Sequence, residues 1–252
     1  MTLALNTLGF RTLHPNHWYQ EPKALDLWHQ EIVLPSIQNG IFQLGTPDFS
    51  RFAALGYAGL ADMPVCFYYR QLLQDFPDCK FVLTTRRSAD VWLRSMTNVQ
   101  GLTTFMHYAA LFIPKAKQYS DYYRWLFSFL TQNNDLLSAS WPTTQILSQS
   151  EREHAMELYQ SHNQRVRETI PSNRLLEFRL GTDGWEALCE FLDVVEECPT
   201  TAPFPRSNSP LCYTFQVISS VTFVVGCFNF VVFRACFRRS SRNAKRTKTK
   251  AT

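Results

Sequence analysis

The chain has 252 residues and a formal net charge of +4 at neutral pH, and aromatic residues make up 14% of it. This length suffices for one α/β domain with a sizeable core, and the aromatic content excludes a disordered chain. Eight Lys or Arg and no acidic residue lie in residues 234–252, so removing these eight charges from +4 leaves −4 for residues 1–233. A mildly acidic main domain argues against a nucleic acid as partner.

The seven cysteines are irregularly spaced and form no C-x-x-C pair. Zinc sites and disulfide frameworks are recognised by regular spacing, so neither is indicated, and we expect buried free thiols. No metal ion is expected in the protein.

The chain opens with a short apolar helix. Residues 2–8 contain three leucines and an alanine, and Gly9 is suited to end a helix. No signal peptide is visible, because no basic start is followed by a long apolar core. Residues 10–13 form a candidate strand that ends at His14. A histidine at a strand end can act as a base or contact a substrate, although a structural histidine is the simpler alternative.

A strand–helix–strand unit follows. Residues 28–41 favour a helix around a proline, and residues 55–61 favour a short strand. Asp62 would lie at the carboxyl end of that strand, where Pro64 stops the strand and opens a helix over residues 65–74. Together with the next strand, this spacing predicts a right-handed parallel crossover.

A strand followed directly by two arginines occupies residues 81–87. The apolar, β-branched run F-V-L-T-T predicts a buried strand, and Ser88 can cap a helix that begins at Ala89. Arg87 would then lie at the carboxyl edge of a parallel sheet, where ligands bind. Ser95 falls on the helix face of the cap, so a phosphate near the helix start could meet both Arg87 and Ser95. The alternative is that both arginines are solvated surface charges.

The second half of the domain contains further helices and one strand. Residues 97–145 are helical and aromatic, which is typical of a core or a lid. Residues 148–169 form an amphipathic helix, residues 175–180 a last strand and residues 184–192 a last helix. The proline-rich run of residues 199–210 excludes regular structure.

The C-terminal part contains a candidate membrane span. Residues 207–233 carry no charge, and the most apolar stretch, residues 215–233, approaches the roughly 20 residues that a helix needs to cross a bilayer. The basic residues 234–252 follow directly. A buried core helix is the alternative, but a folded domain rarely ends in an apolar run with a basic flank.

The order of these elements resembles a branch of the P-loop sulfotransferases found in eukaryotic microbes, over nearly all of residues 2–208. The matching stretches are the opening helix with its Leu-Gly-aromatic end, His14, Asp62-Met63-Pro64, residues 80–95 with Arg87, Trp92 and Ser95, the helix with Tyr159, His162, Asn163 and Val166, and residues 171–176, 184–192 and 203–208. Each piece is weak by itself, whereas their order and spacing together are specific.

The resemblance implies a three-layer α/β fold of the P-loop type, with a parallel sheet and flanking helices. It also implies transfer of a sulfuryl group from 3′-phosphoadenylyl sulfate to a hydroxyl or amine of a small-molecule or glycan acceptor. Arg87 and Ser95 match the residues that hold the 3′-phosphate, and Arg206 is a further candidate for binding this co-substrate. Asp62 stands where relatives carry a catalytic histidine, so it is the candidate base, with His14 as the second candidate.

The family's glycine-rich phosphate loop and its strand precede the helix with which this sequence opens, and no G-x-x-x-x-G-K-[ST] occurs elsewhere. We interpret this as an incomplete gene model, whose upstream reading frame encodes a strand and a glycine-rich loop. A non-catalytic nucleotide-binding or scaffold protein is the alternative. A kinase-like relative is disfavoured, because a Walker lysine and an acidic metal-binding motif are missing.

The predicted organisation is a sulfotransferase-like domain in residues 1–206, a linker in residues 207–214, a transmembrane helix in residues 215–233 and a basic tail in residues 234–252. A span this late in the chain suits post-translational anchoring, and we expect the domain to face the cytosol. The positive-inside rule favours the opposite orientation, with the tail in the cytosol and the domain in the lumen.

Overall fold

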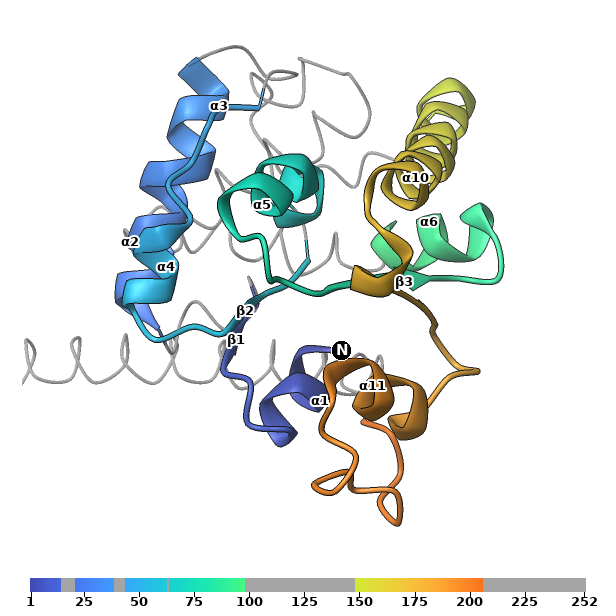
Figure 1. Ribbon diagram of the computed structural model, residues 1–252. Helices are drawn as coiled ribbons and strands as arrows, with labels where there is room; N and C mark the ends of the chain where they lie inside the picture. The colour runs from blue at the N-terminus through green and yellow to red at the C-terminus, as the bar shows by residue number, and fades with distance from the viewer. Residues whose placement is uncertain (15–20, 39–43, 63, 98–147, 206–252) are drawn as a thin grey trace, which may run out of the picture. The chain divides into compact units, whose positions relative to one another are not determined.

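A computed structural model of the protein describes residues 1–14, 21–38, 44–62, 64–97 and 148–205 (Figure 1). In chain order the elements are α1 (Thr2–Thr7), β1 (Thr12–Leu13), α2 (Pro22–Trp28), the π-helical η2 (His29–Val33), α3 (Leu34–Gln38), α4 (Ser50–Ala54), β2 (Gly59–Leu60), the 3-10 helix η3 (Val65–Tyr68), α5 (Tyr69–Asp75), β3 (Phe81–Thr85), α6 (Ala89–Thr97), α10 (Gln149–Thr169), η4 (Ser172–Arg174), β4 (Leu175–Arg179) and α11 (Trp185–Leu192). This alternation of helices and strands confirms the predicted α/β class.

The strands form two parallel pairs. In the first pair, Thr12 of β1 lies opposite Gly59 of β2. In the second, β3 pairs with β4 along its whole length, starting with Phe81 opposite Leu175. Helices η3 and α5 connect β2 to β3 in the predicted order, but these two strands belong to different pairs. We expected one sheet, whereas the described residues hold two separate pairs.

A cavity of about 700 Å³ lies between the two strand pairs. Residues 58–62 around β2 and residues 80–84 around β3 line it, whereas β1 and β4 contribute only Thr12 and Leu175. Residues of both β2 and β3 therefore border the same cavity. A strand edge without a partner can offer its backbone N–H and C=O groups to a further strand.

Helices pack on both faces of the β3–β4 pair. Because side chains alternate between the faces along a strand, Phe178 of β4 packs with Ala4 of α1 and Leu188 of α11 on one face. On the other face, Leu83 of β3 packs with Val166 of α10. The second strand pair is thus the middle of a helix–sheet–helix arrangement.

The helices before β2 pack against β1. Trp28 and Phe52 are buried in one cluster with Leu13, and their rings meet edge to face at 5.3 Å. The helical region begins at Pro22, earlier than the sequence predicted, and β2 is shorter than predicted because Gly56 ends α4 in a turn. Gly56 has a φ of +83°, which glycine adopts without strain.

Local signals in the sequence set several helix ends, of which the end of α1 at Gly9 was predicted. Gly9, with a φ of +86°, closes α1 in a Schellman motif in which the Phe10 N–H donates to the Leu5 carbonyl. At the other end of the domain, Ser148 and Glu151 form a capping box at the start of α10. These contacts satisfy backbone groups that would otherwise lack partners.

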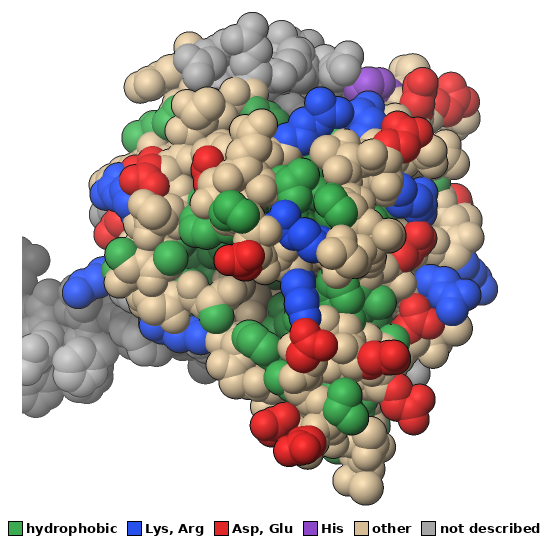
Figure 2. All heavy atoms as spheres, in the orientation of Figure 1, with side chains coloured by type: hydrophobic (Ala, Val, Ile, Leu, Met, Phe, Trp, Pro, Cys, Tyr) green, Lys and Arg blue, Asp and Glu red, His purple; other side chains and the backbone are tan. Residues whose placement is uncertain are grey.

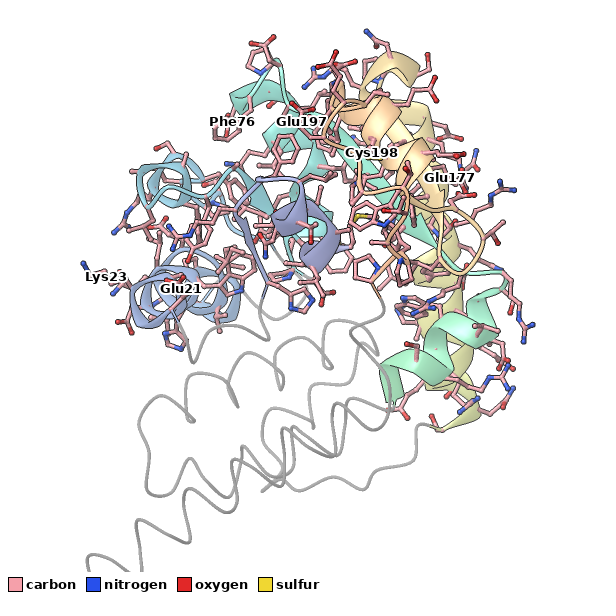
Figure 3. All side chains as sticks on the ribbon, turned by 90° about the horizontal axis from the view of Figure 1, so that it is seen from below. Glu21, Lys23, Phe76, Glu177, Glu197 and Cys198 are labelled. Atoms are coloured by element: carbon pink, nitrogen blue, oxygen red, sulfur yellow. A yellow bond between two sulfur atoms is a disulfide. The ribbon has the colours of Figure 1, made fainter. Side chains whose placement is uncertain are left out.

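Two cysteines form a disulfide, which corrects the expectation of free thiols. Cys189 of α11 is bonded to Cys198, labelled in Figure 3. Asp193 adopts a left-handed conformation just after α11, with a φ of 60°, and turns the chain so that the following loop returns to the helix. The sequence did not reveal the pair because this chain reversal, and no spacing motif, brings the two cysteines together. Cys66 and Cys79 remain free thiols.

Several predictions concern residues outside the described ranges. These include the aromatic segment of residues 98–147, the candidate span of residues 215–233 and Arg206. None of the helices in the described part of the chain combines the length and apolarity needed to cross a bilayer.

Candidate active site

His14 and Asp62 form a pair at the ends of neighbouring strands. His14 directly follows β1 and Asp62 follows β2, so the parallel pairing of these strands brings their carboxyl ends together. The Nε2 atom of His14 lies 3.1 Å from Oδ2 of Asp62. The aspartate side chain is 44% exposed and the histidine 17%, so the carboxylate is accessible while the imidazole is largely covered.

The backbone of Asp62 is unusual. Its φ of 73° lies in the left-handed region, which non-glycine residues rarely adopt. Such conformations concentrate at functional sites, where the surrounding structure holds them. Asp62 also lines the cavity between β2 and β3. A carboxylate in this position, with a histidine partner, can accept a proton from a substrate that reaches hydrogen-bond distance.

The end of β3 presents arginines beside the start of a helix. Ser88 caps α6 as predicted, because its Oγ accepts a hydrogen bond of 3.3 Å from the Val91 N–H. Arg87 is exposed, and within the described residues no group pairs with its guanidinium. An unpaired guanidinium next to the positive end of a helix is suited to bind an anion.

Ser95 is not brought into this group. Ser95 is exposed on α6 and does not line the cavity that contains Arg87. Arg206 lies outside the described residues. The structure thus places Arg87 at the predicted edge, while the predicted roles of Ser95 and Arg206 stay predictions.

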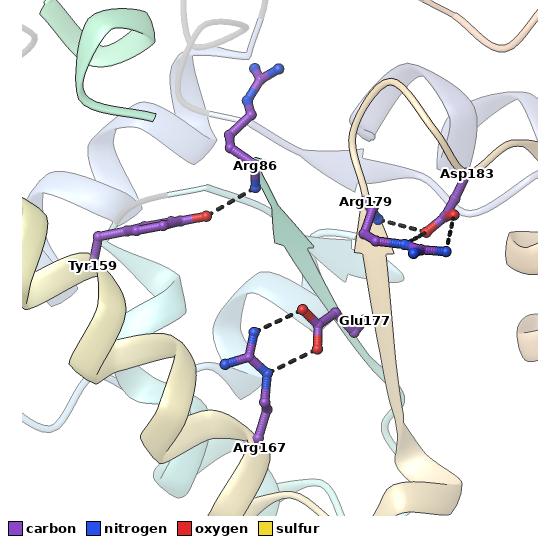
Figure 4. Close-up of polar contacts among 6 residues, drawn as sticks. All are labelled: Arg86, Tyr159, Arg167, Glu177, Arg179 and Asp183. Carbon is purple, nitrogen blue, oxygen red and sulfur yellow. Dashed lines mark hydrogen bonds and ion pairs between the residues drawn. The ribbon is translucent and has the colours of Figure 1, made fainter. Parts of the chain in front are cut away.

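The carboxyl ends of β3 and β4 border a second cavity, of about 800 Å³, that Arg87 lines together with residues of α10. Arg167, Glu177 and Arg179 also line it, and each arginine is paired with a carboxylate (Figure 4). Arg167 of α10 donates two hydrogen bonds, of 2.9 and 2.7 Å, to the Glu177 carboxylate, and Arg179 lies 3.1 Å from Asp183. Since Arg167 and Arg179 are neutralised by carboxylates, they are less available to an anion than Arg87 is.

The pair of Arg167 and Glu177 also fixes the helix that covers this cavity. The hydrogen bonds from Arg167 lower the pKa of the Glu177 carboxyl and raise the pKa of the guanidinium, although burial opposes both shifts. Both groups are therefore charged at neutral pH. Their bidentate contact ties α10 to β4 and so positions α10 over the cavity.

Tyr159 joins three elements around Arg87. Its hydroxyl accepts a hydrogen bond of 3.0 Å from the backbone N–H of Arg86, directly after β3 (Figure 4). Its ring stacks on Trp92 of α6, with 4.7 Å between centroids. The sequence identified Tyr159 only as a residue that matches the family's long helix. It did not predict the contacts of Tyr159 with Arg86 and Trp92, because a tyrosine on an amphipathic helix does not reveal its partner across the fold.

His162 lies on the same helix but has a packing role. Burial, assisted by the charge of Arg165, lowers the pKa of His162 to about 4, so the ring is neutral at pH 7. Phe67 and Tyr69 meet it edge to face, with centroids 5.5 and 5.8 Å away. A neutral imidazole between two aromatic rings packs as an apolar group.

The described surface carries both signs of charge. Acidic and basic side chains are interspersed on the face seen in Figure 2, with apolar side chains between them. In the part of the chain that the structure describes, no three His, Cys, Asp or Glu side chains gather in a way that could hold a metal ion.

The parallel strands with helices on both faces of the β3–β4 pair, and the candidate site at the strand ends, define an α/β domain as the class of protein. The family model described as the sulfotransferase domain matches residues 1–211. The chain therefore belongs to the sulfotransferase domain family, as the sequence resemblance indicated.

One curated relative is "Ava biosynthesis cluster protein M" from Aspergillus versicolor, which is 31% identical to the chain over 181 residues. The alignment covers 68% of the chain and 64% of the relative, so the chain spans less than two thirds of the relative's length.

Proposed function

We propose that the protein is a sulfotransferase that transfers a sulfuryl group from 3′-phosphoadenylyl sulfate to a hydroxyl or amine of a small-molecule or glycan acceptor. Membership of the sulfotransferase domain family supports the reaction class. The observation that carries the proposal is the unpaired guanidinium of Arg87 beside the capped start of α6, because it fits the 3′-phosphate of this co-substrate.

In the proposed reaction, the acceptor oxygen or nitrogen forms a bond to sulfur. The bond between sulfur and the bridging phosphate oxygen breaks, and adenosine 3′,5′-bisphosphate leaves. Asp62 accepts the proton that the acceptor loses, while the contact of 3.1 Å to His14 holds the carboxylate in place. Arg87 binds the 3′-phosphate and thereby fixes the position of the co-substrate.

The cavity between β2 and β3 supports a further part of the proposal, namely that the strand of the family's phosphate loop fills it. Met1 lines this cavity. Asp62 lines the same cavity, at the end of β2. A loop that led from such a strand into α1 would therefore present backbone N–H groups near Asp62.

Replacing Arg87 with Ala tests the proposed co-substrate site. We expect the variant to bind adenosine 3′,5′-bisphosphate about 1.5–3 kcal/mol more weakly, the range for hydrogen bonds to charged groups. Isothermal titration calorimetry measures this difference. Arg94 offers a matched control, because it lies on the adjacent helix α6 and pairs with Asp90 at 2.8 Å. Arg94→Ala should bind as the wild type does, and equal affinity of Arg87→Ala and the wild type would rule out the assignment.

We propose in addition that residues 215–233 anchor the protein in a membrane, with the domain on the lumenal side. The sequence alone favoured a cytosolic domain, but the disulfide between Cys189 and Cys198 is typical of an oxidising compartment. The basic residues 234–252 favour the same orientation, because positive tails tend to remain in the cytosol.

Protease treatment of sealed microsomes checks this orientation. We expect the domain to be protected until detergent is added, whereas a C-terminal epitope after residue 252 should be cleaved at once. Recovery of the protein in the soluble fraction would contradict the anchor, and digestion of the domain without detergent would restore the cytosolic orientation.

A further inference from the structure

The last peptide group of β3, which joins Thr85 to Arg86, is hydrogen-bonded on both sides. Its C=O, from Thr85, accepts a hydrogen bond of 3.0 Å from the Leu180 N–H, directly after β4. Its N–H, from Arg86, donates to the Tyr159 hydroxyl of α10 at 3.0 Å. A side-chain hydroxyl therefore takes the place that a neighbouring strand would have at this peptide group.

The same tyrosine contacts the chain beyond Arg87. The ring of Tyr159 stacks on Trp92, with 4.7 Å between the centroids and 16° between the ring planes. Trp92 lies in the first turn of α6, where its N–H donates to the Ser88 carbonyl at 3.1 Å. Tyr159 thus holds the chain both before Arg87, at the Arg86 N–H, and after it, at the start of the helix.

Helix α10 is suited to support this loop. Further along the helix from Tyr159, Arg167 is tied to the Glu177 carboxylate of β4 by two hydrogen bonds, of 2.9 and 2.7 Å. Val166 packs in one apolar cluster with Leu83 of β3. The helix therefore rests on both strands of this pair, and the Tyr159 hydroxyl has a defined position relative to the end of β3.

The guanidinium of Arg87 has no such support. Arg87 is exposed, and among the residues that the structure describes no group pairs with it. The backbone at Arg87 therefore decides which positions its guanidinium can reach. Groups that bind a ligand must be held within about 0.5 Å of their productive geometry, so the contacts that hold this backbone affect binding.

We propose that Tyr159 is a positioning residue of the co-substrate site, which fixes the backbone from which Arg87 reaches the 3′-phosphate. It acts through the Arg86 N–H and through Trp92, and not by contact with the nucleotide. This inference rests on the proposed function, because it concerns the same phosphate.

Replacing Tyr159 with Phe removes the hydroxyl and keeps the ring that stacks on Trp92. We expect the dissociation constant for adenosine 3′,5′-bisphosphate to rise about 3- to 10-fold, the change that corresponds to one neutral hydrogen bond. The affinity for adenosine 5′-phosphate, which lacks the 3′-phosphate, should not change, whereas a general loss of structure would weaken both ligands. Calorimetry measures both affinities, at a temperature at which circular dichroism shows each variant to be folded.

A double-mutant cycle shows whether Tyr159 acts through Arg87. If it does, adding Tyr159→Phe to Arg87→Ala should not weaken bisphosphate binding further, because the group that it positions is already absent. Tyr69→Phe is the matched control. The Tyr69 hydroxyl also accepts one hydrogen bond, of 3.2 Å from Nε of Arg70, but Tyr69 does not line the cavity that contains Arg87. Tyr69→Phe should bind the bisphosphate as the wild type does.

Three outcomes would overturn this inference and leave the proposed function intact. Unchanged bisphosphate affinity in Tyr159→Phe would show that the hydroxyl does not position the site. Equal weakening of both nucleotides would give Tyr159 a merely structural role. Additive effects of the two substitutions would show that Tyr159 acts independently of Arg87. A wild type that does not bind the bisphosphate would contradict the proposed function, and this inference with it.

Discussion

Replacing Asp62 with Asn is expected to lower turnover by about 10²- to 10⁴-fold, the usual contribution of a general base. The amide retains the shape of the carboxylate but cannot accept the acceptor's proton at neutral pH. Binding of adenosine 3′,5′-bisphosphate should be unaffected, because the proposed phosphate ligand Arg87 follows β3, whereas Asp62 follows β2 in the other strand pair. Turnover is measured with radiolabelled 3′-phosphoadenylyl sulfate and a panel of hydroxyl and amine acceptors.

A His14 variant distinguishes which residue of the His14–Asp62 pair is the base. If Asp62 is the base, His14→Gln keeps most of the activity, since the histidine only holds the carboxylate through its contact of 3.1 Å. If the histidine is the base and Asp62 orients it, both variants lose activity to a similar extent. Glu153→Gln, at an exposed carboxylate on α10, is the matched control and should leave turnover unchanged. Unchanged turnover in Asp62→Asn would exclude the aspartate as the base.

Replacing Phe178 with Ala is expected to reduce the free energy of unfolding by about 3–5 kcal/mol, the range for a large aromatic residue removed from a core. Phe178 is fully buried in the middle of β4, and its ring lies 5.1 Å from that of Phe204. Its neighbours along the strand, Glu177 and Arg179, both line the cavity on the opposite face. The substitution therefore removes the packing beneath the candidate site.

Urea unfolding followed by circular dichroism measures this loss as a lower midpoint with an unchanged slope. Val195 provides the control, because it is 65% exposed and Val195→Ala should change stability by no more than about 0.5 kcal/mol. A loss below about 1 kcal/mol for Phe178→Ala would show that the cluster around β4 is not closely packed.

Local signals in the sequence determined several elements of this protein. The apolar, β-branched run at residues 81–85 predicted β3 with the bounds that the structure has, and Ser88 predicted the start of α6. These features depend on neighbours within a few residues, since a cap bonds to the next turn of its own helix. The order of such elements also carried the family resemblance.

Tertiary structure alone decided which distant residues meet. The parallel pairing of β1 with β2 brings His14 to Asp62, and a chain reversal after α11 brings Cys198 to Cys189. The sequence left Tyr159 as one residue of an amphipathic helix, and only the fold showed that its hydroxyl holds the chain directly after β3. Contacts of this kind depend on how strands pair and helices pack, which no local propensity specifies.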